Sequence, residues 1–246
     1  MKKYLLICLI IAVFCSAFAV SADPIKVAVN PDAKPFKYLD EDGNFAGIDA
    51  EVMKEIAESQ NLEIEYVTMD FEELLNAVAS CEVDAAISAL TLTEKRSEIV
   101  SFTTPYVMGA QSTYVRLAND SWTGISDPSI KVIGAKAGTT SADSAAIISD
   151  MNSVEIRLYP DYGTLFQALE NNEIDAAIAD ELLAKSFVDS YADLMTIGQP
   201  LSAETYAIAV CPNNPELVKT FNDGLNNLRR SGKLDQIVLD NLMPAK

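Results

Sequence analysis

An arginine and an aspartate stand where strand-like runs are expected to meet helices, and together they could bind a small zwitterion. Arg96 follows a buried, strand-like run, and its planar guanidinium matches the geometry of a carboxylate. Asp180 ends a second such run and could accept hydrogen bonds from an ammonium group. Taken singly, Arg96 could instead pair with Glu94 or Glu98 on an exposed helix, and Asp180 could cap the helix that follows it.

Both groups belong to an internal half-repeat. Residues 71–89 and 162–180 align at a constant offset of 91 positions, and seven of the 19 pairs are identical. The first copy ends in the neutral Ala89 and leads to Arg96, whereas the second ends in the acidic Asp180. The repeat predicts two similar α/β lobes whose strand ends offer opposite charges to a shared cleft.

A further strand-to-helix junction, residues 137–141 (AGTTS), also suits an anion. Free N–H groups at a helix N-terminus and nearby hydroxyls attract negative charge. The alternative is an ordinary Ser/Thr helix cap. Phe71 follows a probable strand end and could stack on a ligand, although a core phenylalanine is the alternative.

Several kinds of chemistry are excluded by composition. The chain contains no histidine, so it lacks the residue most used for general acid–base catalysis and transition-metal binding. It also lacks the phosphate-loop and three-glycine dinucleotide patterns and any metal-type cysteine spacing. We therefore expect no catalytic residue, no metal and no cofactor.

The N-terminus indicates export. Lys2 and Lys3 precede an apolar run, and residues 20–22 form a small-residue cleavage site, so residues 1–22 are predicted to be a secretory signal peptide. Lipidation at Cys15 is the alternative, but the bulky Phe14 before it disfavours that processing. Cleavage leaves 16 basic residues against 36 acidic ones, a formal net charge of −20. Such an acidic chain is a poor partner for nucleic acid or anionic lipid.

Strands and helices are expected to alternate along the rest of the chain. The hydrophobic periodicity predicts strands at 25–29, 62–67, 83–89, 131–135, 154–158, 174–179 and 205–211. It predicts helices at 48–59, 71–79, 141–151, 162–171, 181–190, 215–230 and 234–242. Residues 101–116 have an extended, β-branched composition. This alternation without a long linker indicates an α/β fold.

The motifs resemble those of a known family, the periplasmic polar amino-acid-binding proteins of ABC importers, which are solute-binding proteins of family 3. The markers are Pro35-Phe36, Gly47-Ile48-Asp49, Asp70-Phe71, 83–96 (VDAAISALTLTEKR), 102–106 (FTTPY), 137–140 (AGTT), 174–181 (IDAAIADE) and 204–210 (ETYAIAV). The resemblance covers essentially the whole chain after the signal peptide.

The resemblance implies the type II periplasmic-binding-protein fold, with two lobes that are each a mainly parallel sheet flanked by helices. Residues 23–108 and 205–246 would form lobe 1, and residues 109–204 would form lobe 2. Two crossovers, near 107–111 and 201–204, would act as a hinge that lets the lobes close on a ligand.

The resemblance also assigns roles to site residues. Arg96 would bind the ligand α-carboxylate, helped by the backbone N–H groups of Thr91 and Thr140. Asp180 would bind the α-ammonium, together with the Ala89 carbonyl and the Thr91 hydroxyl. The remaining residues expected at the cleft are Ser88, Thr139, Phe71 beside the ligand side chain, and Asn30.

Two departures from the family pattern bear on the ligand side chain. Ala33 stands where many members have an aromatic ring, and Asn30 stands where members that take basic amino acids often have an acid. Asp32 lies close by and could partly replace that acid. We therefore expect a neutral amino acid as the ligand.

The implied function is capture of an amino acid in the periplasm by a monomer that delivers it to a membrane permease. The alternative is an enzyme on the same scaffold, similar to the cyclohexadienyl and arogenate dehydratases. Glu181 would then be the candidate general acid.

Two cysteines remain after the signal peptide is removed. Cys81 and Cys211 could form a disulfide in an exported chain, or remain as two separate buried thiols. The topology of the family places both at the edge of lobe 1 that lies away from the cleft, which implies a Cys81–Cys211 bond.

Overall fold

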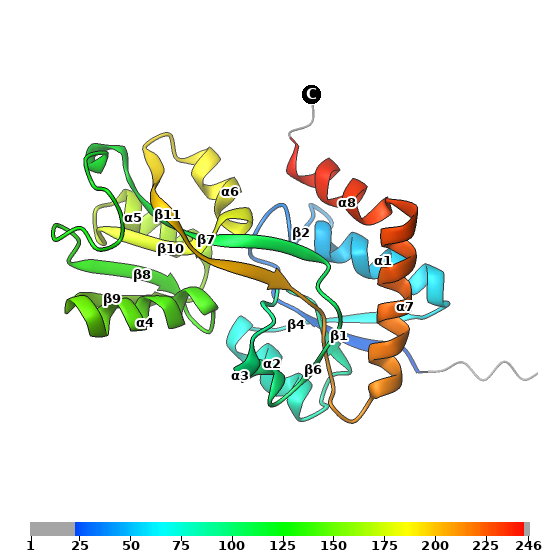
Figure 1. Ribbon diagram of the computed structural model, residues 1–246. Coiled ribbons are helices and arrows are strands. Elements are labelled where there is room, and N and C mark those ends of the chain that lie inside the picture. The colour runs from blue at the N-terminus through cyan, green and yellow to red at the C-terminus, as the bar shows by residue number, and fades with distance from the viewer. Residues whose placement is uncertain (1–22, 244–246) are drawn as a thin grey trace, which may run out of the picture.

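The computed structural model describes residues 23–243 and has two α/β lobes, each built on a five-stranded sheet (Figure 1). This is the two-lobed α/β fold that the sequence predicts. The signal peptide and the cysteine at position 15 lie outside the described residues.

The first lobe contains the sheet of order β4-β1-β5-β12-β6. Its strands are β1 (Ile25–Val29), β4 (Ile64–Thr68), β5 (Ala85–Ala86), β6 (Ser101–Phe102) and β12 (Ala209–Val210). β1 runs parallel to β4 and β5, whereas β12 runs antiparallel to β5 and β6. The short strands β2 (Tyr38–Leu39) and β3 (Phe45–Ala46) form a separate hairpin.

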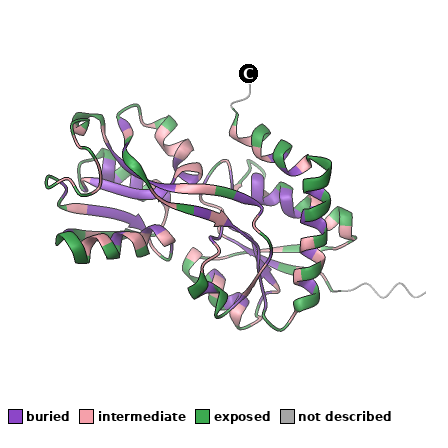
Figure 2. Cartoon of the chain, viewed as in Figure 1, coloured by how far each residue is buried: buried purple, intermediate pink, exposed green. Residues whose placement is uncertain are grey.

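Helices cover both faces of this sheet. They are α1 (Ile48–Gln60), α2 (Phe71–Ala79), α3 (Glu94–Ser97), α7 (Pro215–Ser231) and α8 (Lys233–Leu242). Alternate residues of β1 point to opposite faces, so Ala28 belongs to the core under α2, whereas Val27 and Val29 belong to the core shared with α1 and α7. The buried strands and the inward faces of the helices are visible in Figure 2.

The second lobe contains the sheet of order β11-β7-β10-β8-β9. Its strands are β7 (Val107–Arg116), β8 (Val132–Lys136), β9 (Glu155–Tyr159), β10 (Ala176–Asp180) and β11 (Leu194–Tyr206). Its helices are α4 (Thr140–Asn152), α5 (Tyr162–Glu170) and α6 (Glu181–Ser190), with a 3₁₀ turn, η1, at Leu117–Asn119. All five residues of β10 are buried, as its unbroken run of small residues predicts.

The half-repeat is also a structural repeat. Asp84 accepts a hydrogen bond from Lys26 N at 2.8 Å, and Asp175, its counterpart 91 positions later, accepts one from Lys131 N at 2.8 Å. In the first lobe Asp84 therefore holds the start of β1, which pairs with β5. In the second lobe Asp175 holds the start of β8, which pairs with β10.

Two long strands connect the lobes. β7 and β11 pair antiparallel from Val107↔Tyr206 to Arg116↔Leu194, with a shift in register between Ile197 and Ser202. Figure 1 shows both strands running side by side from one lobe to the other. Residues 194–204 are not predicted from the sequence to be a strand. The register shift between Ile197 and Ser202 interrupts the alternation of buried and exposed residues that would indicate one.

The strand predicted at 83–89 is shorter in the structure, where only Ala85 and Ala86 make ladder pairs. The chain turns away after Ser88, because Ala89 has a φ of +47° and its N–H donates to the Asp49 carboxylate at 2.8 Å. The helix that begins at Glu94 is also brief and ends at Ser97.

A disulfide joins Cys81 and Cys211, whose Cα atoms are 5.2 Å apart. It lies beside the paired ends of β5 and β12, at Ala85↔Val210. Ala89, a predicted site residue, follows the other end of β5. The disulfide therefore links Cys211, after β12, to the first lobe at the end of the sheet that lies away from the predicted site.

Candidate functional site

A small buried cavity of about 10 Å³ lies where the two lobes meet. Seven of the predicted site residues line it: Phe71, Ala89, Thr91 and Arg96 from the first lobe, and Thr139, Thr140 and Asp180 from the second. This volume holds at most about one water molecule. The lobes are therefore closed on each other, and an amino acid could enter only after they separate.

Arg96 bridges the two lobes. Its backbone N–H donates to Thr93 Oγ1 at 3.2 Å, which caps the short helix and fixes the start of the side chain. Its guanidinium donates to the Thr91 carbonyl at 2.8 Å and to the Gly138 carbonyl of the second lobe at 3.0 Å. A guanidinium has five N–H donors, so three remain for other acceptors.

Asp180 is a buried carboxylate with one unsatisfied oxygen. It is 4% exposed, and its Oδ2 accepts a hydrogen bond from the Tyr206 hydroxyl at 3.2 Å. Its Oδ1 is buried and has no hydrogen-bond partner. Burial, together with the neighbouring Glu204, raises the pKa of Asp180 to about 7, although Tyr206 and Arg96 act in the opposite direction. A buried acceptor without a donor is costly, and a cationic donor would relieve that cost.

Thr139 and Thr140 lie at the N-terminus of α4. Thr139 Oγ1 accepts from Ala142 N at 3.3 Å, so it is a helix cap as well as a cavity residue. Thr140 Oγ1 accepts from Gln111 Nε2 at 2.8 Å and donates to Glu204 at 3.1 Å. The 137–141 segment therefore forms the predicted helix cap, and Thr139 and Thr140 also line the cavity.

Ser88 and Asn30 lie behind the cavity and are not among the residues that line it. The Ser88 hydroxyl is fully buried and accepts from Asn30 N at 3.1 Å. The Asn30 side chain donates to the Met69 carbonyl at 3.1 Å and accepts from Lys136 Nζ at 2.8 Å. These two residues hold the neighbouring loops of the first lobe in place.

Two buried lysines of the site, Lys37 and Lys136, are not predicted from the sequence. Lys37 lines the cavity, and its Nζ donates to the Asn30 carbonyl at 2.9 Å and pairs with Asp32. Lys136, from the second lobe, reaches Asp32 Oδ2 at 2.5 Å. Lys136 directly precedes the AGTTS segment at the end of β8, and this position is the signal that could have identified it.

The charged groups of this cluster shift one another's pKa values. Burial, together with Lys37, lowers the pKa of Lys136 to about 7, against the attraction of Asp32. Burial alone would raise the pKa of Asp32, but the two lysines lower it. Asp32 is therefore already paired with two protein cations.

Glu181 does not reach the cavity. It accepts a short hydrogen bond from the Ser112 hydroxyl and is not among the lining residues. The structure therefore gives this carboxyl group a partner within the second lobe, outside the closed cavity.

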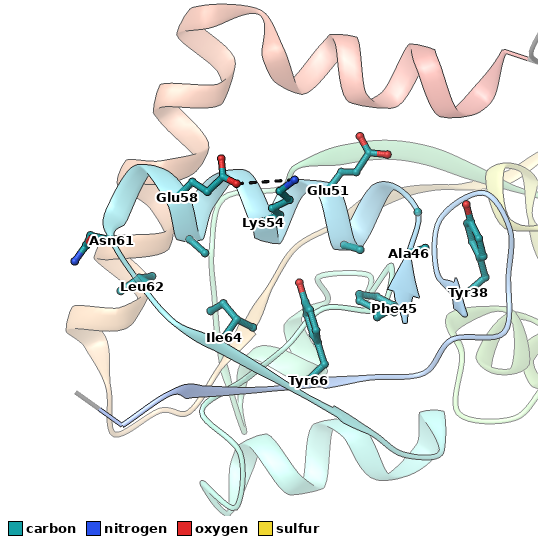
Figure 3. A pocket seen from close by; sticks show the side chains of 13 residues that line it. Tyr38, Phe45, Ala46, Glu51, Lys54, Glu58, Asn61, Leu62, Ile64 and Tyr66 are labelled. Atoms are coloured by element: carbon teal, nitrogen blue, oxygen red, sulfur yellow. Dashed lines mark ion pairs between the residues drawn. The ribbon is translucent and has the colours of Figure 1, made fainter. Parts of the chain in front are cut away.

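A larger hollow of about 560 Å³ lies on the outside of the first lobe, between α1 and β4 (Figure 3). Its lining includes Phe45, Ile64 and Tyr66, and its rim carries a Lys54–Glu58 ion pair at 3.9 Å. It is open and mostly apolar, and it lacks the opposed carboxylate and guanidinium that mark the cavity between the lobes. We therefore assign the functional site to the smaller cavity.

Within residues 23–243, no helix is long and apolar enough to cross a membrane. No group of three or more acidic, cysteine or histidine side chains in this part of the chain could hold a metal ion.

Comparison with known proteins is consistent with this arrangement. A probable histidine-binding protein of Campylobacter jejuni is 30% identical over 217 residues, covering 87% of this chain and 83% of the relative. An arginine-binding extracellular protein of Bacillus subtilis is 28% identical over 251 residues and covers 96% of each chain. The solved structure of an ancestral arginine-binding protein bound to arginine superposes with a TM-score of 0.84 at 28% identity, covering 90% of this chain and 99% of that one.

The family model for bacterial extracellular solute-binding proteins, family 3, matches residues 25–241, nearly all of the described chain. The chain belongs to the bacterial extracellular solute-binding proteins of family 3.

Proposed function

We propose that this protein captures a free amino acid between its two lobes in the periplasm and delivers it, as a monomer, to the membrane permease of an ABC importer. The observation that carries the proposal is the pair formed by Arg96 and Asp180. Both line one buried cavity, and Asp180 Oδ1 lacks a donor there.

The two groups match the two ends of an amino acid. The remaining guanidinium donors of Arg96 suit an α-carboxylate, and Asp180 Oδ1 suits an α-ammonium. The N-terminus of α4 at Thr140 adds a favourable site for negative charge. Both charged pairs would strengthen as closure excludes water.

The proposal includes a hinge motion. Lobe 1 would comprise residues 23–108 and 205–246, lobe 2 would comprise residues 109–204, and the paired strands β7 and β11 would bend where they pass between them. Support comes from the closed cavity, which leaves no path for a ligand unless the lobes move apart.

The test is thermal unfolding of residues 23–246 in the presence of each of the twenty L-amino acids. A ligand at about 100 times its dissociation constant should add about 2.7 kcal/mol to the free energy of unfolding. Arg96→Ala should abolish that shift. The matched control Arg157→Ala, which removes a partly exposed guanidinium paired with Glu155, should leave it intact.

Absence of a shift with every amino acid would refute the proposal. Incubation with prephenate or arogenate should yield no aromatic product, since Glu181 is bonded to Ser112 outside the cavity. Turnover of either compound would instead favour the dehydratase alternative.

A further inference from the structure

The ammonium group of Lys136 crosses from one lobe to the other. Lys136 is the last residue of β8 in the second lobe, and its side chain is 1% exposed. Its Nζ donates to Asn30 Oδ1 at 2.8 Å and to Asp32 Oδ2 at 2.5 Å, both in the first lobe. Its own backbone carbonyl accepts from Thr139 Oγ1 at 2.7 Å, which ties it to a cavity residue.

The same ammonium group lies against the aromatic side chains of the cavity. It is 4.6 Å from the ring centre of Phe71 and 5.2 Å from that of Tyr162, and both rings line the cavity. Cations within about 6 Å of an aromatic face are attracted to it. A protein cation therefore lies against Phe71, the ring that the family resemblance places beside the ligand side chain.

Two lysine side chains face this part of the site. Lys37 lies 5.6 Å from the Phe71 ring centre, so two lysines share the single carboxylate of Asp32. Asp49 and Asp180 also attract Lys37, and Asp161 attracts Lys136. Asp49, however, is buried and engaged by Tyr106 and by Ala89 N, and the proposed function assigns Asp180 to the ligand ammonium. A ligand side chain that carried a further positive charge would have to lie beside Lys136 and Lys37 and would be repelled.

An acceptor would meet the opposite situation. An ammonium group has three N–H donors, and Lys136 uses two of them on Asn30 and Asp32. No protein acceptor takes the third among residues 23–243, and Lys136 does not itself line the closed cavity, so an oxygen at the end of a ligand side chain would reach this donor only after the lobes separate. A carboxylate or an amide carbonyl would both supply that oxygen.

We propose that Lys136 determines specificity: it takes the place of a basic ligand side chain, so that the protein binds amino acids whose side chains end in a carboxylate or amide oxygen and discriminates against arginine and lysine. This inference rests on the proposed function. It separates the chain from relatives that are named for arginine.

The experiment is calorimetric titration of residues 23–246 with glutamate, aspartate, glutamine, asparagine, arginine and lysine. At least one of the first four should bind, and arginine and lysine should bind about 10-fold more weakly or worse, a difference of about 1.4 kcal/mol. The comparison of glutamate with glutamine, and of aspartate with asparagine, distinguishes a carboxylate from an amide.

Lys136→Met keeps the length of the side chain and removes its charge. It should weaken the preferred ligand by about 10-fold or more and strengthen arginine, because Asp32 and the face of Phe71 become accessible to a ligand cation. The matched control is Lys95→Met, which removes an exposed lysine that faces Asp143 across the lobes at 4.0 Å. It should leave the order of preference unchanged.

The outcomes separate the two proposals. If the wild-type protein binds no amino acid, the proposed function fails and this inference fails with it. If the wild-type protein binds arginine as tightly as glutamine or glutamate, or if folded Lys136→Met keeps the wild-type preference, the role of Lys136 is refuted while the proposed function stands. The wild-type panel decides the question even if Lys136→Met does not fold.

Discussion

Replacing Asp180 by asparagine should make the ligand-free protein more stable while abolishing binding. The ordinary pKa of an aspartate is 3.8, and burial and Glu204 raise that of Asp180 to about 7. Between these two values the folded state holds the proton more tightly than the unfolded state does, so the stability contributed by this group falls as pH rises. Above pH 7 the whole cost of the ionised, buried carboxylate is present.

The size of the effect follows from this shift. Each pKa unit corresponds to about 1.4 kcal/mol, so the cost of ionised Asp180 is about 4 kcal/mol at pH 8 and about 2 kcal/mol at pH 5. Asparagine cannot ionise and removes that cost. Asp180→Asn should therefore gain up to about 4 kcal/mol at pH 8, which corresponds to a rise in Tm of about 8–16 °C for a domain of this size.

The assay is thermal and denaturant unfolding of both proteins at pH 8 and pH 5. Asp49 also has a pKa of about 7, but it is present in both proteins and cancels in their difference. Asp189→Asn, which removes a partly exposed partner of Lys185, should change stability by less than about 0.5 kcal/mol at either pH.

Two results would refute the reasoning. Asp180→Asn could be no more stable than the wild-type protein at pH 8, or its gain could fail to shrink on acidification. The variant should also lose any stabilisation by amino acids, because its neutral amide cannot replace the charge opposite the ligand ammonium. Loss of function with a gain in stability is the usual mark of a buried binding group.

Two further variants test the frame of the site. Cys81→Ser combined with Cys211→Ser removes a disulfide that spans 130 positions. The double variant should lower the free energy of unfolding by up to about 5 kcal/mol and retain ligand affinity. Unchanged denaturation midpoints would contradict this. Gly138→Ala places a Cβ at 2.7 Å from Glu72 Cγ of the opposite lobe, at a φ of +72°, and should weaken ligand binding by about 10-fold or more, the equivalent of about 1.4 kcal/mol. The control is Gly43→Ala, since Gly43 has a φ of +82° and a Cβ there would have no heavy atom within 4 Å. This variant should carry a similar backbone strain, about 1–3 kcal/mol, but its ligand affinity in titrations should be unchanged.

The parts of the fold that local patterns determine were predictable. The helices at 71–79 and 181–190 have the predicted bounds, because their apolar spacing is regular. Arg96 and Asp180 could be placed in one cleft because each follows the end of a strand, and strand ends in such folds meet at one edge. The half-repeat supported both inferences.

The missed parts depend on contacts between distant segments. Lys136 is one polar residue at a strand end, and only the opposite lobe supplies its partners, Asn30 and Asp32. The strand predicted at 83–89 is short because Asp49, some 40 positions earlier, captures Ala89 N. Neither contact leaves a periodic signal in the sequence, so hydrophobic periodicity could not reveal it, and for Lys136 the available signal was its place directly before the AGTTS segment.

The paired strands between the lobes have a mechanical consequence. From Gln111↔Ser202 to Val107↔Tyr206, the two crossovers pair with each other as an antiparallel ladder with no break in register. Neither can lengthen or slide without breaking the ladder, so the easy deformations of this ribbon are bending and twisting. If the lobes move as proposed, this ribbon would hold them at a fixed separation, and its bending would return Arg96 and Asp180 to the same relative position at every closure.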